Sequence, residues 1–152
     1  MGEIVEFMPE HIGLIVPMEF QECKGIEGWG SSNREQLLAQ AMSGPAFSYC
    51  SDDGKILAIS GATLFWPGVG WGWAIIDRMA FQDSVGLVHA FMRGIDLLFK
   101  LGAFHRIQTT VRADYDRGLR LAHVLGFTDD ICRLKKFDRD GSDHILFAKL
   151  AR

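Results

Sequence analysis

The chain has 152 residues, of which 48% are hydrophobic and 23% are charged, and its formal net charge is −3. This length and composition predict a single folded domain, 1–152, and the small negative charge argues against nucleic acid as a partner. No apolar run approaches the roughly 20 residues of a membrane span, and the three cysteines form no C-x-x-C pair, so we expect reduced thiols in a cytoplasmic protein without a membrane anchor.

The first half of the chain predicts one strand, two helices and three further strands. Pro17 should end the first helix, and Ser32 and Glu35 have the spacing of a capping box at the start of the second. Asp53-Gly54 is typical of a tight hairpin turn. The expected elements are a strand at 3–7, helices at 8–16 and 32–43, and strands at 46–50, 56–66 and 71–76.

The second half predicts a long helix, a strand, a short helix and two closing strands. Apolar residues repeat at helical spacing from Ser84 to Leu101, and Gly102 should end that helix. Asp114 is a candidate cap for the short helix, in which "LRLAHVLGF" places Gly126 at a left-handed terminus. The expected strands lie at 105–112, 130–137 and 142–150. The order β-α-α-β-β-β-α-β-α-β-β predicts a mixed α+β domain of about seven strands and four helices around one sheet.

Most motifs that carry chemistry are absent from the sequence. It contains no P-loop, no H-E-x-x-H and no G-x-S-x-G, and its histidines never fall at ligand spacing, so we expect no metal. "DRDGSD" has some likeness to a calcium loop, but no glutamate follows at the required spacing, and a hairpin turn is the favoured interpretation.

The order of elements and the segment "LAHVLGF" after the strand "HRIQTTV" resemble the GNAT superfamily of acyl-CoA-dependent N-acyltransferases. The resemblance covers nearly the whole chain. More narrowly, "GVGWGWAII" before the long helix resembles small acetyltransferase-like proteins of short-tailed bacteriophages, some of which are virion components.

The resemblance implies that acetyl-CoA is the co-substrate and lies between the strands matching "WGWAIIDRM" and "HRIQTTV". The first strand and the start of the following helix would hold its pantetheine arm and its pyrophosphate. The family's glycine pattern is not matched by "AFQDSVGLVH", and Asp83 or Ser84 capping the helix is the alternative role for this loop. The candidate cofactor-binding residues are Ile75, Ile76, Met79, Phe81, Ser84, Val85, Gly86 and Arg117.

The resemblance also implies a general acid and a general base. The family's tyrosine, four residues before the glycine of L-G-F, is replaced here by Ala122, which leaves Tyr115 as the nearby phenol. Asp77 is the first candidate for the base and Glu22 the second. The alternatives are a surface pair for Asp77 and a capping or packing role for Tyr115.

The function implied by the resemblance is transfer of an acetyl group to a primary amine by direct attack in a ternary complex. The acceptor would be a small molecule or a protein, and a homodimer stays open. The alternative is a catalytically silent protein that uses the same fold for binding or for a structural role, for example in a phage virion or against a host protein.

Overall fold

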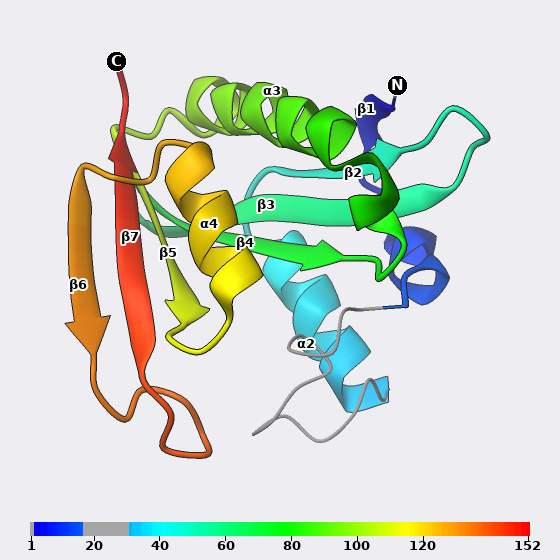
Figure 1. The fold of residues 1–152 in the computed structure, drawn as a ribbon. Coiled ribbons are helices and arrows are strands. Elements are labelled where there is room, and N and C mark those ends of the chain that lie inside the picture. Colours follow the sequence, from blue (N-terminus) through cyan, green and yellow to red (C-terminus); the bar gives the residue numbers. More distant parts are fainter. Residues whose placement is uncertain (1, 17–30) are drawn as a thin grey trace.

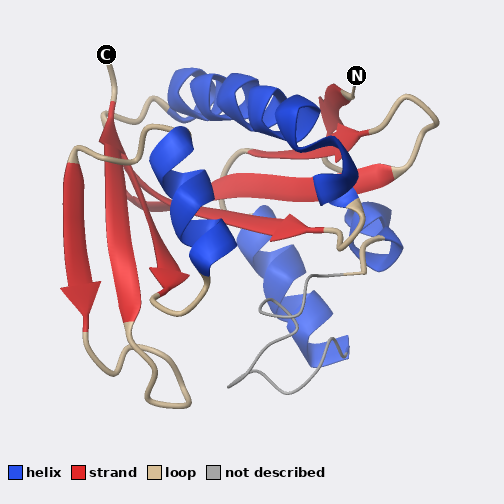
Figure 2. Cartoon of the chain, viewed as in Figure 1, coloured by secondary structure: helices blue, strands red, loops and turns tan. Residues whose placement is uncertain are grey.

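The computed structural model describes residues 2–16 and 31–152, with the side chains of residues 31–34 and 81 also outside the description. Seven strands form one sheet in the order β1-β2-β3-β4-β5-β7-β6 (Figures 1 and 2). The expected mixed α+β domain with about seven strands and four helices is confirmed. The strands are β1 (Glu3–Glu6), β2 (Ala46–Cys50), β3 (Ile56–Trp66), β4 (Val69–Ile76), β5 (Arg106–Arg112), β6 (Asp130–Leu134) and β7 (His144–Leu150).

Helices cover both faces of this sheet. The long helix α3 (Ser84–Gly102) and the short helix α4 (Asp116–Val124) pack on one face, where Ile76, Phe91 and Ile107 share the larger buried cluster (Figure 1). The 3-10 helix η1 (Pro9–Leu14) and α2 (Ser31–Ala41) pack on the other face around Ile59. A short 3-10 turn, η2 (Ala80–Asp83), leads into α3.

Several helix boundaries differ from the sequence-based expectation. The first helix is 3-10 and has six residues, and α3 includes Gly102 and ends with Ala103 in the left-handed region at φ 51°. Gly102 is needed for a different reason, because a Cβ there would lie 2.1 Å from the buried ring of Phe104. Close packing, not backbone freedom, therefore selects this glycine.

Two further boundaries, the start of α4 and the end of β6, also differ from the expectation. The N-cap of α4 is Tyr115, one residue after the predicted Asp114, and the Asp114 carboxylate accepts hydrogen bonds from Arg112. The strand expected at 130–137 ends at Leu134. The left-handed Gly126 is confirmed at φ 87°, and so is the turn in "DRDGSD", where Gly141 has φ 81°.

Some absences concern only the described part of the chain. There, no helix is long and apolar enough to cross a membrane. In the same residues no group of three or more His, Cys, Asp or Glu side chains is placed to hold a metal ion. Cys50 and Cys132 are free thiols, while Cys23 lies outside the described residues.

Candidate functional site

Among the strands that the structure describes, β4 and β5 are the one parallel pair, and they are hydrogen-bonded only at their beginnings. Their pairing runs from Val69 opposite Arg106 to Trp71 opposite Gln108. Beyond these pairs β4 continues against β3, and β5 continues against β7. The two strands therefore diverge in the middle of the sheet, as Figure 1 shows below α4.

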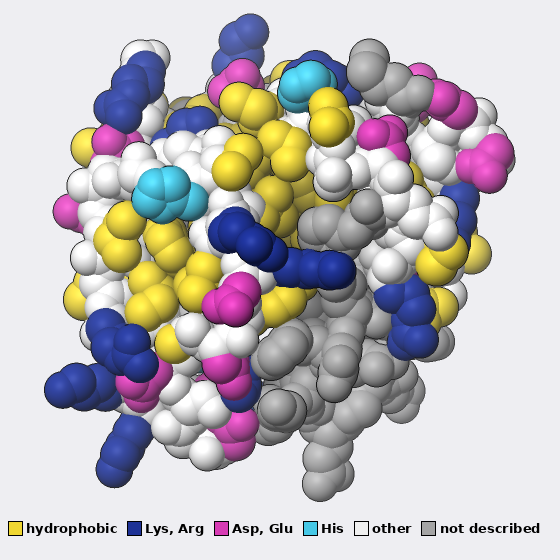
Figure 3. Space-filling view, in the orientation of Figure 1, with side chains coloured by type: hydrophobic (Ala, Val, Ile, Leu, Met, Phe, Trp, Pro, Cys, Tyr) yellow, Lys and Arg dark blue, Asp and Glu magenta, His cyan; other side chains and the backbone are white. Residues whose placement is uncertain are grey.

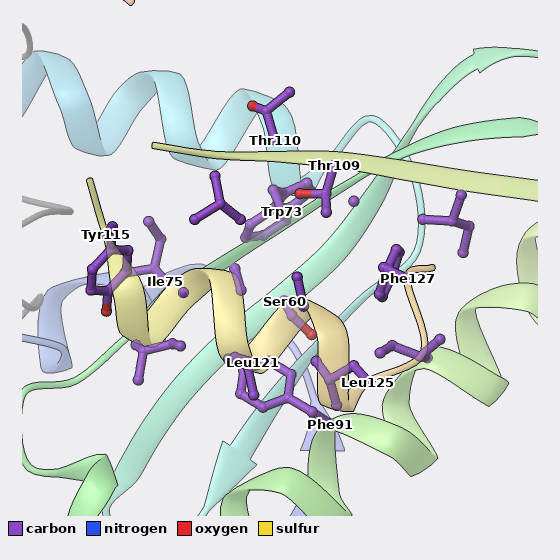
Figure 4. A pocket seen from close by; sticks show the side chains of 18 of the residues that line it. Ser60, Trp73, Ile75, Phe91, Thr109, Thr110, Tyr115, Leu121, Leu125 and Phe127 are labelled. Atoms are coloured by element: carbon purple, nitrogen blue, oxygen red, sulfur yellow. The ribbon is translucent and has the colours of Figure 1, made fainter. Parts of the chain in front are cut away.

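A cavity of about 330 Å³ occupies the space between the diverging strands. Its walls come mainly from β4, β5, α3 and α4, with contributions from β3 and from the connection between β6 and β7, and most of its lining side chains are apolar (Figure 4). In the space-filling view, hydrophobic side chains line a hollow in this face, and Lys and Arg side chains lie at its edge (Figure 3).

The cavity passes through the plane of the sheet. Successive residues of a strand point to opposite faces, yet Trp73, Ala74, Ile75 and Ile76 all line it. Ile76 belongs to the buried cluster under α3 and α4, whereas Trp73 and Ile75 pack against the cluster under η1 and α2. A molecule in the cavity is thus within reach of groups on both faces.

Helix α4 forms the roof of the cavity with small residues. Ala122 is 6% exposed and lines the cavity together with Gly118. A Cβ at Gly118 would lie 2.5 Å from the Tyr115 ring and 2.7 Å from Val111, so the glycine lets α4 approach β5 closely. Tyr115 lies at one end of the cavity, and partial burial raises the pKa of its phenol.

Arg112, at the end of β5, is a buried cation that lines the cavity. Its guanidinium donates to Asp114 at 3.1 Å, to Asp138 at 3.0 Å and to Asp140 at 3.1 Å, and also to the hydroxyl of Ser142. The hydrogen bond to Asp114 is the largest of the effects that raise the pKa of Arg112. The connection between β6 and β7 is therefore tied to the end of β5.

The same connection brings His144 to the cavity. Its Nε2 lies 3.0 Å from Asp138. Burial alone would raise the pKa of Asp138, but hydrogen bonds from His144, from the backbone N–H of Arg139 and from Arg112 together outweigh it, so the pKa is lowered. A hydrogen bond with Ser142 lowers the pKa of Asp140 to about 2.

Asp77 follows β4 directly and is 1% exposed, but it lies outside the cavity lining. Its Oδ2 accepts from the backbone N–H of Val16 at 2.9 Å, and its Oδ1 accepts from that of Met79 at 2.9 Å. Lys55 lies 3.6 Å from the same carboxylate. These contacts count against Asp77 as a base, although that role stays a prediction.

The N-terminus of α3 is capped by a neighbouring side chain of the same chain. Asp83 is the N-cap, and its Oδ1 accepts from the backbone N–H of Gly86 at 3.0 Å. Beside it Ser84 and Val85 are exposed, as is Met79. The alternative interpretation, in which Asp83 caps the helix, therefore describes the observed contact.

The structure brings together only part of the predicted site. Ile75, Ile76 and Tyr115 line the cavity, and Arg117 is exposed on α4. Glu22 and the side chain of Phe81 lie outside the description. The remaining predicted residues lie outside the lining: Asp77, Met79, Ser84, Val85 and Gly86.

Sequence reasoning missed several lining residues. Thr109, Thr110, Leu121, Asp138 and His144 were assigned only to elements or turns. Consecutive residues on opposite faces of β5 line the cavity because the strand has lost its neighbour, and strand alternation alone does not signal that loss.

The comparisons with known proteins concern the fold. No family model and no curated protein matches the sequence. Solved structures do match: Ard1 from Thermoplasma volcanium has a TM-score of 0.77 at 16% identity, covering 99% of this chain and 98% of that chain. A GNAT-family acetyltransferase from Bacillus anthracis has a TM-score of 0.74 at 13% identity, with coverages of 97% and 93%.

A third match is a protein whose name includes its acceptor. Ribosomal-protein-S5-alanine acetyltransferase from Vibrio fischeri has a TM-score of 0.68 at 18% identity, covering 98% of this chain and 92% of that chain. Over nearly its whole length, the chain therefore has the fold of the GNAT acetyltransferases.

Proposed function

We propose that the protein is an N-acyltransferase that transfers an acetyl group from acetyl-CoA to a primary amine. The observation that carries this proposal is the cavity between the diverging strands β4 and β5, which is lined by residues from both faces of the sheet. A donor held on one face and an amine arriving from the other would meet inside it. Such positioning lowers the barrier because a reaction between two bound reactants has a high effective concentration.

The cavity fits the acyl and pantetheine part of such a donor. It has about 330 Å³ of space, and the small side chains of Gly118 and Ala122 keep it open under α4. The indole N–H of Trp73 is buried without an acceptor among the described residues. Because an unsatisfied buried donor is costly, this N–H favours a bound group that carries an acceptor.

Acetyl-CoA would supply an acetyl group activated as a thioester, so that attack by the amine forms the C–N bond as the C–S bond breaks. Tyr115 is our candidate for the acid that protonates the departing sulfur, since it lines the cavity and a phenol carries its proton at neutral pH. The base is less well placed. Asp77 is engaged with backbone N–H groups, and Glu22 lies outside the described residues.

The acceptor is proposed only as a class, a small molecule or protein that carries a primary amine. The relative from Vibrio fischeri is named for an alanine of a ribosomal protein. A protein N-terminus is therefore one acceptor to include beside small amines.

A second candidate is a binding or structural protein, such as a component of a phage virion, built on the same fold without catalysis. Two observations favour it: Ala122 stands where the family's tyrosine is expected, and Asp83 closes the start of α3. Donor binding separates the two candidates.

The test is thermal unfolding with increasing acetyl-CoA, followed by measurement of thiol release with a panel of primary amines. A ligand at 100 times its Kd stabilises a protein by about 2.7 kcal/mol, which gives a clear rise in Tm. Ala122→Phe should fill the cavity and abolish the shift, whereas Val124→Phe, at a 58% exposed position on the same helix, should retain it. Absence of any shift at millimolar acetyl-CoA would overturn the enzyme proposal.

A further inference from the structure

The start of α3 has the properties of an anion site. The first N–H groups of a helix have no partner within the helix, and the aligned peptide dipoles place partial positive charge there. Helix starts of this kind commonly bind phosphate. With 19 residues, α3 is long enough to show the full effect.

In this chain the position is already filled by an anion. The Asp83 carboxylate accepts a hydrogen bond from the backbone N–H of Gly86 at 3.0 Å. A Cβ at Gly86 would lie 2.3 Å from Oδ2 of Asp83, so a larger residue there would displace this carboxylate from its present position. The glycine that the sequence suggests for a phosphate loop therefore serves the protein's own side chain.

The surroundings of this carboxylate offer little to a diphosphate. Met79 is 43% exposed and Val85 is 67% exposed, and neither side chain donates a hydrogen bond. Arg78, an exposed cation shortly before Asp83 in the sequence, already interacts with another group. A diphosphate placed here would meet a like charge and would have to compete for an N–H that Asp83 holds.

We propose that Asp83 determines donor specificity: the protein recognises the acyl group and pantetheine arm of the donor and gains little from its nucleotide diphosphate. The donor class is then acyl thioesters of pantetheine, with or without the adenosine diphosphate part. This proposal rests on the proposed function, because it concerns the donor of the same cavity.

The experiment compares acetyl-CoA, S-acetyl-4′-phosphopantetheine and S-acetylpantetheine as ligands of the purified protein by calorimetry. We expect their Kd values to agree within about threefold. Asp83→Asn removes the charge but keeps a residue that caps helices well. This variant should bind acetyl-CoA at least tenfold more tightly than the wild type does, and its Kd for S-acetylpantetheine should equal that of the wild type.

Asp96→Asn is the matched control, since it makes the same change of charge at an exposed position further along α3. It should alter none of the three affinities by more than twofold. The inference is overturned if the wild type binds acetyl-CoA at least 30-fold more tightly than S-acetylpantetheine and Asp83→Asn shows the same ratio. That result would leave the proposed function standing. If none of the three donors binds, the proposed function itself fails.

Discussion

Replacing Arg112 with methionine removes a guanidinium that is 7% exposed and donates to four side chains. Methionine keeps an unbranched side chain of similar length, so the packing of the stem is largely retained. What changes is the charge. Three carboxylates that converge on one cation would then face each other without it.

The expected loss follows from how far each carboxylate can turn to water. Breaking a fully buried ion pair costs about 3–5 kcal/mol, because the remaining charge stays buried and unpaired. Asp138 is 16% exposed, while Asp140 is 30% and Asp114 is 55% exposed, so only Asp138 is mostly removed from solvent. We therefore expect the free energy of unfolding to fall by about 2–3 kcal/mol.

The assay is urea unfolding at neutral pH, with Arg106→Met as the matched control. Arg106 lies on the same strand but pairs with Asp130, whose side chain is 61% exposed. A pair this open to solvent contributes less than about 1 kcal/mol. Equal losses in the two variants, at unchanged urea dependence, would refute the argument that the burial of Arg112 sets the difference.

The remaining predictions also concern stability. Gly94→Ala should lower the free energy of unfolding by about 1–3 kcal/mol, although alanine favours helices, because its Cβ would lie 2.2 Å from the Tyr49 hydroxyl. In urea unfolding, the double variant with Tyr49→Phe should recover part of this loss. Burial raises the pKa of Tyr49 to about 12 from 10.0, so its contribution to stability is complete below pH 10 and is lost as the pH rises toward 12. In Tyr49→Phe, the free energy of unfolding should fall less over this pH range, and an unchanged fall would count against this assignment. The pKa of Asp140 is lowered to about 2 from 3.8, so its contribution to stability is complete above pH 4 and is lost as the pH falls toward 2. In Asp140→Asn, the free energy of unfolding should therefore fall less between pH 4 and pH 2 than in the wild type.

The order of elements was predictable because each one has a local signal. The apolar repeat from Ser84 to Leu101 marks α3, and Asp53-Gly54 marks the turn between β2 and β3. Boundaries were less predictable where tertiary contacts decide them. The N-cap of α4 falls on Tyr115 and not on Asp114, and no local pattern shows that the Asp114 carboxylate also accepts a hydrogen bond from Arg112.

The cavity was predictable only through the family resemblance. Of the residues that the resemblance indicated, Ile75, Ile76 and Tyr115 line the cavity. The resemblance did not indicate Asp138 or His144, because their approach depends on the hairpin connection folding back onto Arg112, across more than 20 residues of sequence.

Two buried charged residues explain why the cavity stays open. Parallel strands that start in register would continue to pair unless their ends are held elsewhere. Asp77, just past β4, binds the N–H of Val16 on the face of η1, and Arg112, at the end of β5, binds the connection between β6 and β7. Each diverging end is thus tied by a residue that is at most 7% exposed to a different part of the chain. Because a charge so deeply buried is costly without its partners, each of these contacts opposes further pairing of β4 with β5.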